Sequence, residues 1–154
     1  YGGKQVGDAE LVRFYRDVVN LKPAAVIILA GTNDIARNTG PQTAEMIQDN
    51  FQAMAELARA HNIKVVLCSL TPVSDYGKVP QTVRRPPADI LKLNAWLRDY
   101  AAKTGAVYAD YFTPLADEKG FLRQGLSEDG LHPNAKGYQL MVPVAEAALA
   151  KALQ

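Results

Sequence analysis

Two short polar segments of the sequence carry side chains that could catalyse a reaction. One is Asp129-Gly130-Leu131-His132-Pro133, in which a carboxylate precedes an imidazole by three residues across a glycine. Such a carboxylate can fold back onto one ring nitrogen, fixing the tautomer and leaving the other nitrogen free as a general base. The proline favours extended backbone at His132 and keeps the ring out of a following helix. Taken alone, the segment could equally be a structural turn with a surface histidine.

The other segment is Gly31-Thr32-Asn33-Asp34, which directly follows a continuous apolar run. Glycine allows the chain to turn sharply at this point. The Asn33 amide is a neutral donor pair, suited to stabilising negative charge that develops on a carbonyl oxygen. A local explanation competes with this one, because Asn and Asp after a strand often simply begin the next helix.

The elements that must position these segments follow from the apolar pattern. An unbroken apolar run, typical of a strand buried on both faces, spans residues 24–30. Residues 64–70 repeat this pattern, and a third strand is predicted over residues 106–112. Four amphipathic stretches alternate with them and predict helices over residues 9–19, 43–61, 87–103 and 134–153. Pro143 is expected to kink or break the last helix. The alternation predicts an α/β fold, a three-layer α/β/α sandwich around a mainly parallel sheet, with ligands bound beyond the carboxyl ends of the strands.

Length and composition restrict the class of protein. The chain has 154 residues, of which 48% are apolar, and a net charge of +1. This length predicts a single domain over residues 1–154, and the small charge argues against nucleic-acid binding. No apolar run reaches the length of a membrane span, and the single cysteine, Cys68, excludes an internal disulfide. We therefore expect a soluble protein of bacterial type, either cytoplasmic or secreted.

Together, the two polar segments resemble the SGNH (GDSL-type) hydrolase family, and the similarity runs along the whole sequence. The resemblance implies a flavodoxin-like α/β fold and hydrolysis of carboxylic esters without a cofactor. Acyl or acetyl esters, lysophospholipids and acetylated carbohydrates are the substrates that it suggests. It also implies that His132 is the base of a Ser-His-Asp triad, that Asp129 is its acid, and that Asn33 contributes to the oxyanion hole.

The sequence departs from the family pattern at the nucleophile. In the family, the serine belongs to a Gly-Asp-Ser block after the first strand, whereas Ser69, Ser74 and Ser127 stand in other contexts. Gly2 or Gly3 is the candidate for the backbone donor of the oxyanion hole, unless both are merely terminal residues. We therefore expect the first strand and its serine to come from further residues, a second fragment or a partner chain.

The irregular stretch 71–86 follows the second predicted strand and so borders the predicted site. Tyr76 could contact an acyl or sugar group of a substrate, and Arg84 and Arg85 an anionic one. A solvated loop with surface arginines is the simpler interpretation of the same residues.

Two other classes of function compete with the esterase. One is a binding module of the same fold, a pseudoenzyme, because the sequence has a base and an oxyanion donor without the nucleophile. The other is a metal-dependent hydrolase with Asp129 and His132 as ligands. The second is weak, since a catalytic metal normally has three protein ligands and no further set is clustered here, so no metal site is predicted.

Overall fold

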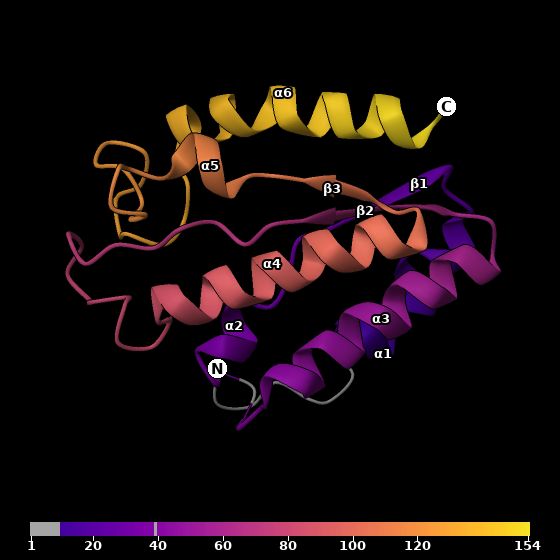
Figure 1. Cartoon of the computed structure of the whole chain (residues 1–154), viewed down its shortest axis with the longest axis horizontal. Helices are drawn as coiled ribbons and strands as arrows, with labels where there is room; N and C mark the ends of the chain where they lie inside the picture. The colour runs from indigo at the N-terminus through magenta and orange to yellow at the C-terminus, as the bar shows by residue number, and fades with distance from the viewer. Residues whose placement is uncertain (1–9, 39) are drawn as a thin grey trace.

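A parallel sheet forms the middle layer of the molecule (Figure 1). The computed structural model describes residues 10–38 and 40–154. Within them, strands β1 (Ala25–Ile28), β2 (Lys64–Cys68) and β3 (Val107–Ala109) lie side by side in that order. Both neighbouring pairs are parallel, as expected for strands joined by helical crossovers. Each strand is shorter than the apolar run that predicted it, because the last residues of each run leave the ladder where the loops begin.

Helices cover both faces of the sheet. Helix α6 (Ala135–Ala152) packs against β2 and β3 on one face, whereas α3 (Ala44–Ala60) and α4 (Pro87–Thr104) pack on the other. These three helices agree with the predicted ones to within one residue at each end. Before β1, helix α1 (Glu10–Asp17) is followed by a 3-10 turn, η2 (Val19–Leu21), so the first predicted helix is divided in two. The predicted α/β/α layering is confirmed.

Strand β2 shows why its apolar run does not alternate with polar residues. Val65 and Leu67 belong to the apolar cluster beneath α3 and α4, whereas Val66 and Cys68 belong to the cluster beneath α6. All four side chains are buried. A strand covered on both faces has no position for a polar side chain, which is the condition that the sequence pattern indicated.

Helix α6 runs through Pro143 without the break that the sequence predicted. Proline removes one backbone donor and so frees the carbonyl of Gln139, four residues earlier. Both residues lie on the solvent side of α6, where water can bond that carbonyl and the helix continues. None of the helices within the two described ranges is both long and apolar enough to cross a membrane.

Two one-turn helices were missed by the sequence pattern. They are α2 (Thr32–Ile35), after β1, and α5 (Phe112–Leu115), after β3. Four residues are too few to show a helical period. Both lie at the carboxyl edge of the sheet, and α2 carries Asn33.

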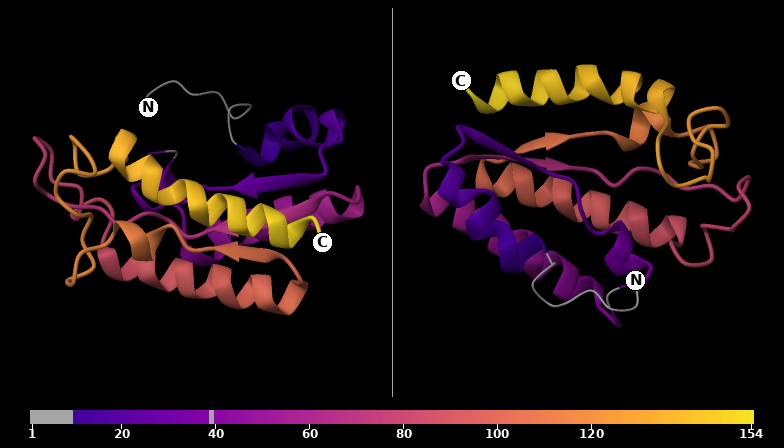
Figure 2. Two further views of the ribbon diagram at one scale, coloured as in Figure 1. Left: turned by 90° about the horizontal axis from the view of Figure 1, so that it is seen from above. Right: turned by 180° about the vertical axis from the view of Figure 1, so that it is seen from behind.

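The stretch 71–86 contains no helix or strand, as predicted. It lies beside the segment 116–134, which leads into α6, at the carboxyl edge of the sheet (Figures 1 and 2). A backbone hydrogen bond of 2.8 Å from the Ser74 N–H to the Gly130 carbonyl joins the two segments. The structure therefore brings the turn that contains Asp129 and His132 into contact with this loop.

Strand β1 has no strand on its outer side among residues 10–38 and 40–154. Ile28 is buried beneath the helices of one face, whereas Ile27 and Leu29 on the other face are 38% and 48% exposed. Helix α6 packs chiefly on β2 and β3 and does not cover this part of the sheet. Figure 2 shows β1 at the sheet edge, on the side away from β3. An apolar surface and a free strand edge are thus both exposed on β1.

Candidate active site

The carboxylate of Asp129 lies against the imidazole of His132, with 2.6 Å between Oδ2 and Nδ1. A carboxylate only accepts hydrogen bonds, so Nδ1 carries the proton of the neutral ring and donates it. The other ring nitrogen, Nε2, is then an acceptor turned away from Asp129. The pair can therefore act as a general base through Nε2.

The Asp129 carboxylate is itself held in place by its second oxygen. Oδ1 accepts hydrogen bonds from the backbone N–H of His132 (2.8 Å), the backbone N–H of Leu131 (2.9 Å) and the hydroxyl of Ser127 (3.0 Å). Burial by itself raises the pKa of this carboxyl, but these hydrogen bonds and that of the imidazole outweigh it and hold the pKa well below its usual range. Asp129 is thus a fixed negative charge beside the ring.

Ser127 is a residue of the site that the sequence reasoning did not assign. Its hydroxyl bonds Asp129 and also accepts from the backbone N–H groups of Asp129 and Gly130. A serine two residues before an Asp-Gly pair is a turn signal and could have revealed this position. Ser127 is buried and shapes the turn that carries the pair.

The turn packs so tightly on the loop 71–86 that two positions admit only glycine. Gly130 has a φ of +76°, and a Cβ there would lie 2.2 Å from the carbonyl oxygen of Ser74. A Cβ on Gly77 would lie 2.5 Å from the carbonyl oxygen of Asp129. The loop is thus a rigid support for the turn.

Asn33 does not begin the helix that contains it. The N-terminal cap of α2 is Gly31, and no side chain caps the helix there. The Asn33 side chain is exposed, and its Oδ1 accepts hydrogen bonds from Nδ2 of Asn38 (2.9 Å) and Nη2 of Arg85 (3.4 Å). These bonds occupy the oxygen of the amide and leave its NH2 group without a bonded acceptor among the described residues.

The three loop residues proposed to contact substrate all have partners within the protein. The Tyr76 hydroxyl donates to the carbonyl of Arg123, and Arg84 Nη2 donates to Oδ1 of Asn38. Arg85 is only 4% exposed, so its interpretation as a surface arginine was wrong. One of its two hydrogen-bond partners, Asn33, is 52 positions away in the chain, and a sequence pattern does not reveal such a contact.

Two serines in the described part of the chain are occupied structurally. Ser69 is fully buried, and its hydroxyl accepts from the backbone N–H of Phe112 at 2.8 Å. Ser127 is engaged with Asp129, whereas Ser74 is half-buried in the loop. Burial also raises the pKa of the Cys68 thiol to about 12, which keeps it protonated and a poor nucleophile. Neither buried serine nor Cys68 is accessible to a substrate.

Gly2 and Gly3, the candidate backbone donors, lie outside the described residues. Within residues 10–38 and 40–154, no three His, Cys, Asp or Glu side chains are grouped so that they could hold a metal ion.

Known proteins resemble this chain in sequence and in fold. Residues 1–140 match the sequence profile of the GDSL-like lipase/acylhydrolase family. A predicted acylhydrolase from Bacteroides fragilis is 38% identical, with a TM-score of 0.86 over 94% of this chain and 69% of its own. A GDSL-like lipase from Bacteroides thetaiotaomicron is also 38% identical, with a TM-score of 0.85 over 93% and 70%.

A more distant neighbour bears on the fold alone. It is an acetylxylan esterase from Geobacillus stearothermophilus, 15% identical, with a TM-score of 0.73 over 91% of this chain and 65% of its own. Comparison with curated proteins gives no significant match.

Proposed function

The chain belongs to the GDSL-like lipase/acylhydrolase family, and we propose that its site hydrolyses carboxylic esters by acyl transfer through a serine. The observation that carries this proposal is the 2.6 Å contact between Asp129 and His132. It leaves His132 Nε2 free to take a proton, and the exposed NH2 group of Asn33 is free to meet an oxyanion. Ester hydrolysis by a serine needs a base to take the hydroxyl proton and a donor to stabilise the oxyanion, and these two segments supply one each.

Each step of the proposed reaction uses a named atom. The serine oxygen bonds the ester carbonyl carbon while His132 Nε2 takes the hydroxyl proton, and the Asn33 NH2 group donates to the carbonyl oxygen as it becomes negative. The bond to the alcohol then breaks, and His132 returns the proton to the leaving oxygen. Water repeats the sequence on the acyl-serine and releases the acid. Asp129 remains ionised and orients the imidazolium throughout.

The nucleophile, in this proposal, comes with a further strand that pairs with the outer edge of β1. An N-terminal segment, a second fragment or a partner chain could carry it. The free edge of β1 and the exposed Ile27 and Leu29 support such a strand, since strands of parallel sheets are normally covered on both faces. The His132 side chain is 78% exposed, which suits a ring whose partner approaches from outside the described chain.

The relatives support the same source for the nucleophile. Both Bacteroides proteins have residues beyond those that this chain matches. In the acetylxylan esterase, replacement of a serine by alanine at the fifteenth residue is described as a catalytic mutation. We infer that the substrates are small acyl or acetyl esters, with acetylated carbohydrates and lysophospholipids as the classes to test.

A non-catalytic binding module of the same fold is the second candidate. It is favoured by one observation: Ser69 and Ser127, two of the three serines in the sequence, are buried and engaged in structural hydrogen bonds. In this case the site would bind an ester or a related acyl compound without cleaving it.

Covalent capture distinguishes the two candidates. The full-length protein is treated with a fluorophosphonate, the labelled peptide is located by mass spectrometry, and turnover of p-nitrophenyl acetate is measured in parallel. The esterase predicts label on a serine outside the 154 residues, retained in Ser74→Ala and abolished in His132→Ala. Label on Ser74 would contradict the proposed source of the nucleophile. A folded parent that takes no label and cleaves no ester would favour the binding module.

A further inference from the structure

The two neighbouring arginines of the loop 71–86 set the orientation of two amide side chains. A guanidinium has only donors, so whatever atom faces it within hydrogen-bond distance must be an acceptor. Arg84 therefore faces the oxygen of Asn38, which turns the NH2 group of Asn38 toward Asn33. Arg85 faces the oxygen of Asn33 directly. Both constraints lead to one orientation of the Asn33 amide, with its oxygen inward and its NH2 group outward.

Arg85 is unusual among the cations of this chain. It is almost fully buried, yet among the described residues it forms no ion pair, and its Nε has no hydrogen-bond partner. Its bonds run to two amide oxygens, Oε1 of Gln81 at 2.8 Å and Oδ1 of Asn33 at 3.4 Å. A buried cation without a carboxylate is a poor way to stabilise a fold. A buried cation of this kind is typical of functional sites, where the side chain orients its neighbours rather than stabilises the fold.

Gln81 continues the same chain of bonds toward the base. Because Arg85 occupies its oxygen, Gln81 directs its NH2 group to the backbone carbonyls of Val79 (3.2 Å) and Asp129 (3.4 Å). Arg85 thus lies between the amide of Asn33 and the turn that carries Asp129. Arg85 and Gln81 together bridge the two segments that the sequence alone could only place at the same edge of the sheet.

From this arrangement we infer that Arg85 and Asn38 are positioning residues that hold the Asn33 amide with its NH2 group toward the developing oxyanion. The inference rests on the proposed esterase function. Without these two donors the amide can rotate by half a turn and present its oxygen instead. An acceptor at that point repels the negative charge that forms in the transition state.

The test is a pair of double-mutant cycles in the full-length protein. In the parent background, Arg85→Met is expected to lower kcat for p-nitrophenyl acetate by about 10- to 100-fold, with KM little changed. Asn38→Ala, on a partly exposed loop, is expected to lower kcat by less. In the Asn33→Ala background, neither substitution should lower kcat further, because each acts through the amide that is already absent.

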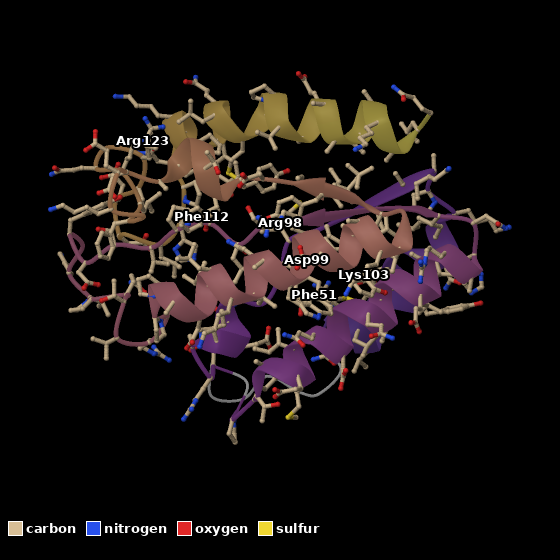
Figure 3. The ribbon with its side chains drawn as sticks, in the orientation of Figure 1. Phe51, Arg98, Asp99, Lys103, Phe112 and Arg123 are labelled. Atoms are coloured by element: carbon tan, nitrogen blue, oxygen red, sulfur yellow. The ribbon has the colours of Figure 1, made fainter. Side chains whose placement is uncertain are left out.

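Arg98→Met is the matched control, since Arg98 lies on the outer surface of α4 with its side chain 64% exposed (Figure 3). It removes the same charge and should leave kcat unchanged. If Arg85→Met and Asn38→Ala lower kcat equally with and without Asn33, their role is structural and the inference is overturned. No effect in an active parent overturns it as well. If Arg85→Met does not fold, the cycle with Asn38→Ala tests the inference by itself.

A readout without turnover separates this inference from the proposed function. The side-chain ¹H–¹⁵N signals of Asn33 are identified by their loss in Asn33→Ala. They are expected to move in Asn38→Ala and Arg85→Met and to stay in place in Arg98→Met. If the parent cleaves no ester but the Asn33 signals still move in Asn38→Ala and Arg85→Met, the esterase proposal fails and the positioning of Asn33 stands. If the signals do not move, the positioning is refuted.

Discussion

Oδ2 of Asp129 lies 2.6 Å from Nδ1 of His132, and both residues belong to one turn in which the backbone N–H groups of Leu131 and His132 donate to the same carboxylate. The base and the group that orients it are therefore fixed together, before any substrate is present.

Asp129→Asn should lower the rate of ester hydrolysis by about 10³–10⁴-fold, because the amide favours the wrong tautomer of His132. The measurement is kcat/KM for p-nitrophenyl acetate in the full-length protein. The double variant Asp129→Asn/His132→Ala should lose little more activity than His132→Ala alone, since triad members act as a unit. Asp99→Asn, on the outer surface of α4, is the control (Figure 3). A variant Asp129→Asn with nearly full activity would remove Asp129 from the mechanism.

Asn33→Ala should lower kcat by about 10²–10³-fold, the usual loss for one oxyanion donor. KM should change little, because the hydrogen bond strengthens only as negative charge develops on the substrate oxygen. Steady-state kinetics with a series of acyl esters provides the measurement. Asn20→Ala, an exposed asparagine in η2, is the matched control. A rise in KM with kcat unchanged would assign Asn33 to substrate binding instead.

Gly130→Ala should destabilise the protein more than Gly125→Ala, although both glycines have positive φ, at +76° and +84°. A left-handed backbone costs a residue with Cβ about 1–2 kcal/mol. A Cβ on Gly125 meets open space, so Gly125→Ala has this backbone cost alone. A Cβ on Gly130 also collides with the Ser74 carbonyl, so Gly130→Ala has a steric cost in addition. Urea denaturation of the two variants measures the difference. Equal losses of unfolding free energy in the two variants would show that the loop 71–86 moves aside to admit the new methyl group.

Asn94→Ala should cost about 2–6 kcal/mol of unfolding free energy. Asn94, on α4, is buried and bonds both backbone groups of Leu70, accepting from its N–H at 2.7 Å and donating to its carbonyl at 3.1 Å. Its removal leaves two buried polar groups without partners, each worth about 1–3 kcal/mol. Lys92→Ala, exposed on the same helix, should change stability by less than about 0.5 kcal/mol. Chemical denaturation distinguishes the two, and a small loss in Asn94→Ala would mean that water replaces the amide.

The stabilisation that Asp129 provides should disappear in acid. Its folded-state pKa lies below the unfolded value of about 3.9, so its contribution is complete above about pH 4 and is lost as the pH falls further. The difference in unfolding free energy between the parent and Asp129→Asn should accordingly be constant from pH 5 to pH 7 and shrink toward pH 2. The carboxyl is partly exposed, so the difference itself should be modest. A difference that grows in acid would contradict the lowered pKa.

Sequence reasoning succeeded where local chemistry decides the structure. The apolar run through Val65, Val66 and Leu67 predicted a strand covered on both sides, and it is one. The spacing of Asp129 and His132 predicted their contact, because three residues and a glycine suffice to close that turn.

The sequence could not predict what depends on contacts between distant segments. Arg85 stands in a polar, proline-rich stretch that is typical of a solvated loop, yet Asn33, 52 positions earlier in the chain, helps to hold it inside. Gln81 shows the same limit, since its role depends on reaching Asp129, 48 positions away. Helix α2 was missed for another reason, because a single turn has no period to detect.

The loop 71–86 offers unequal room for engineering. Near Gly77 its backbone touches that of Asp129, so an insertion or a larger residue there would displace the base together with the loop. The Val83 side chain is 80% exposed, although the two arginines that follow it bond to Asn38 and Asn33. A library intended to change which esters are accepted without loss of turnover should therefore diversify Val83 itself and keep Arg84, Arg85 and the Gly77 end unchanged.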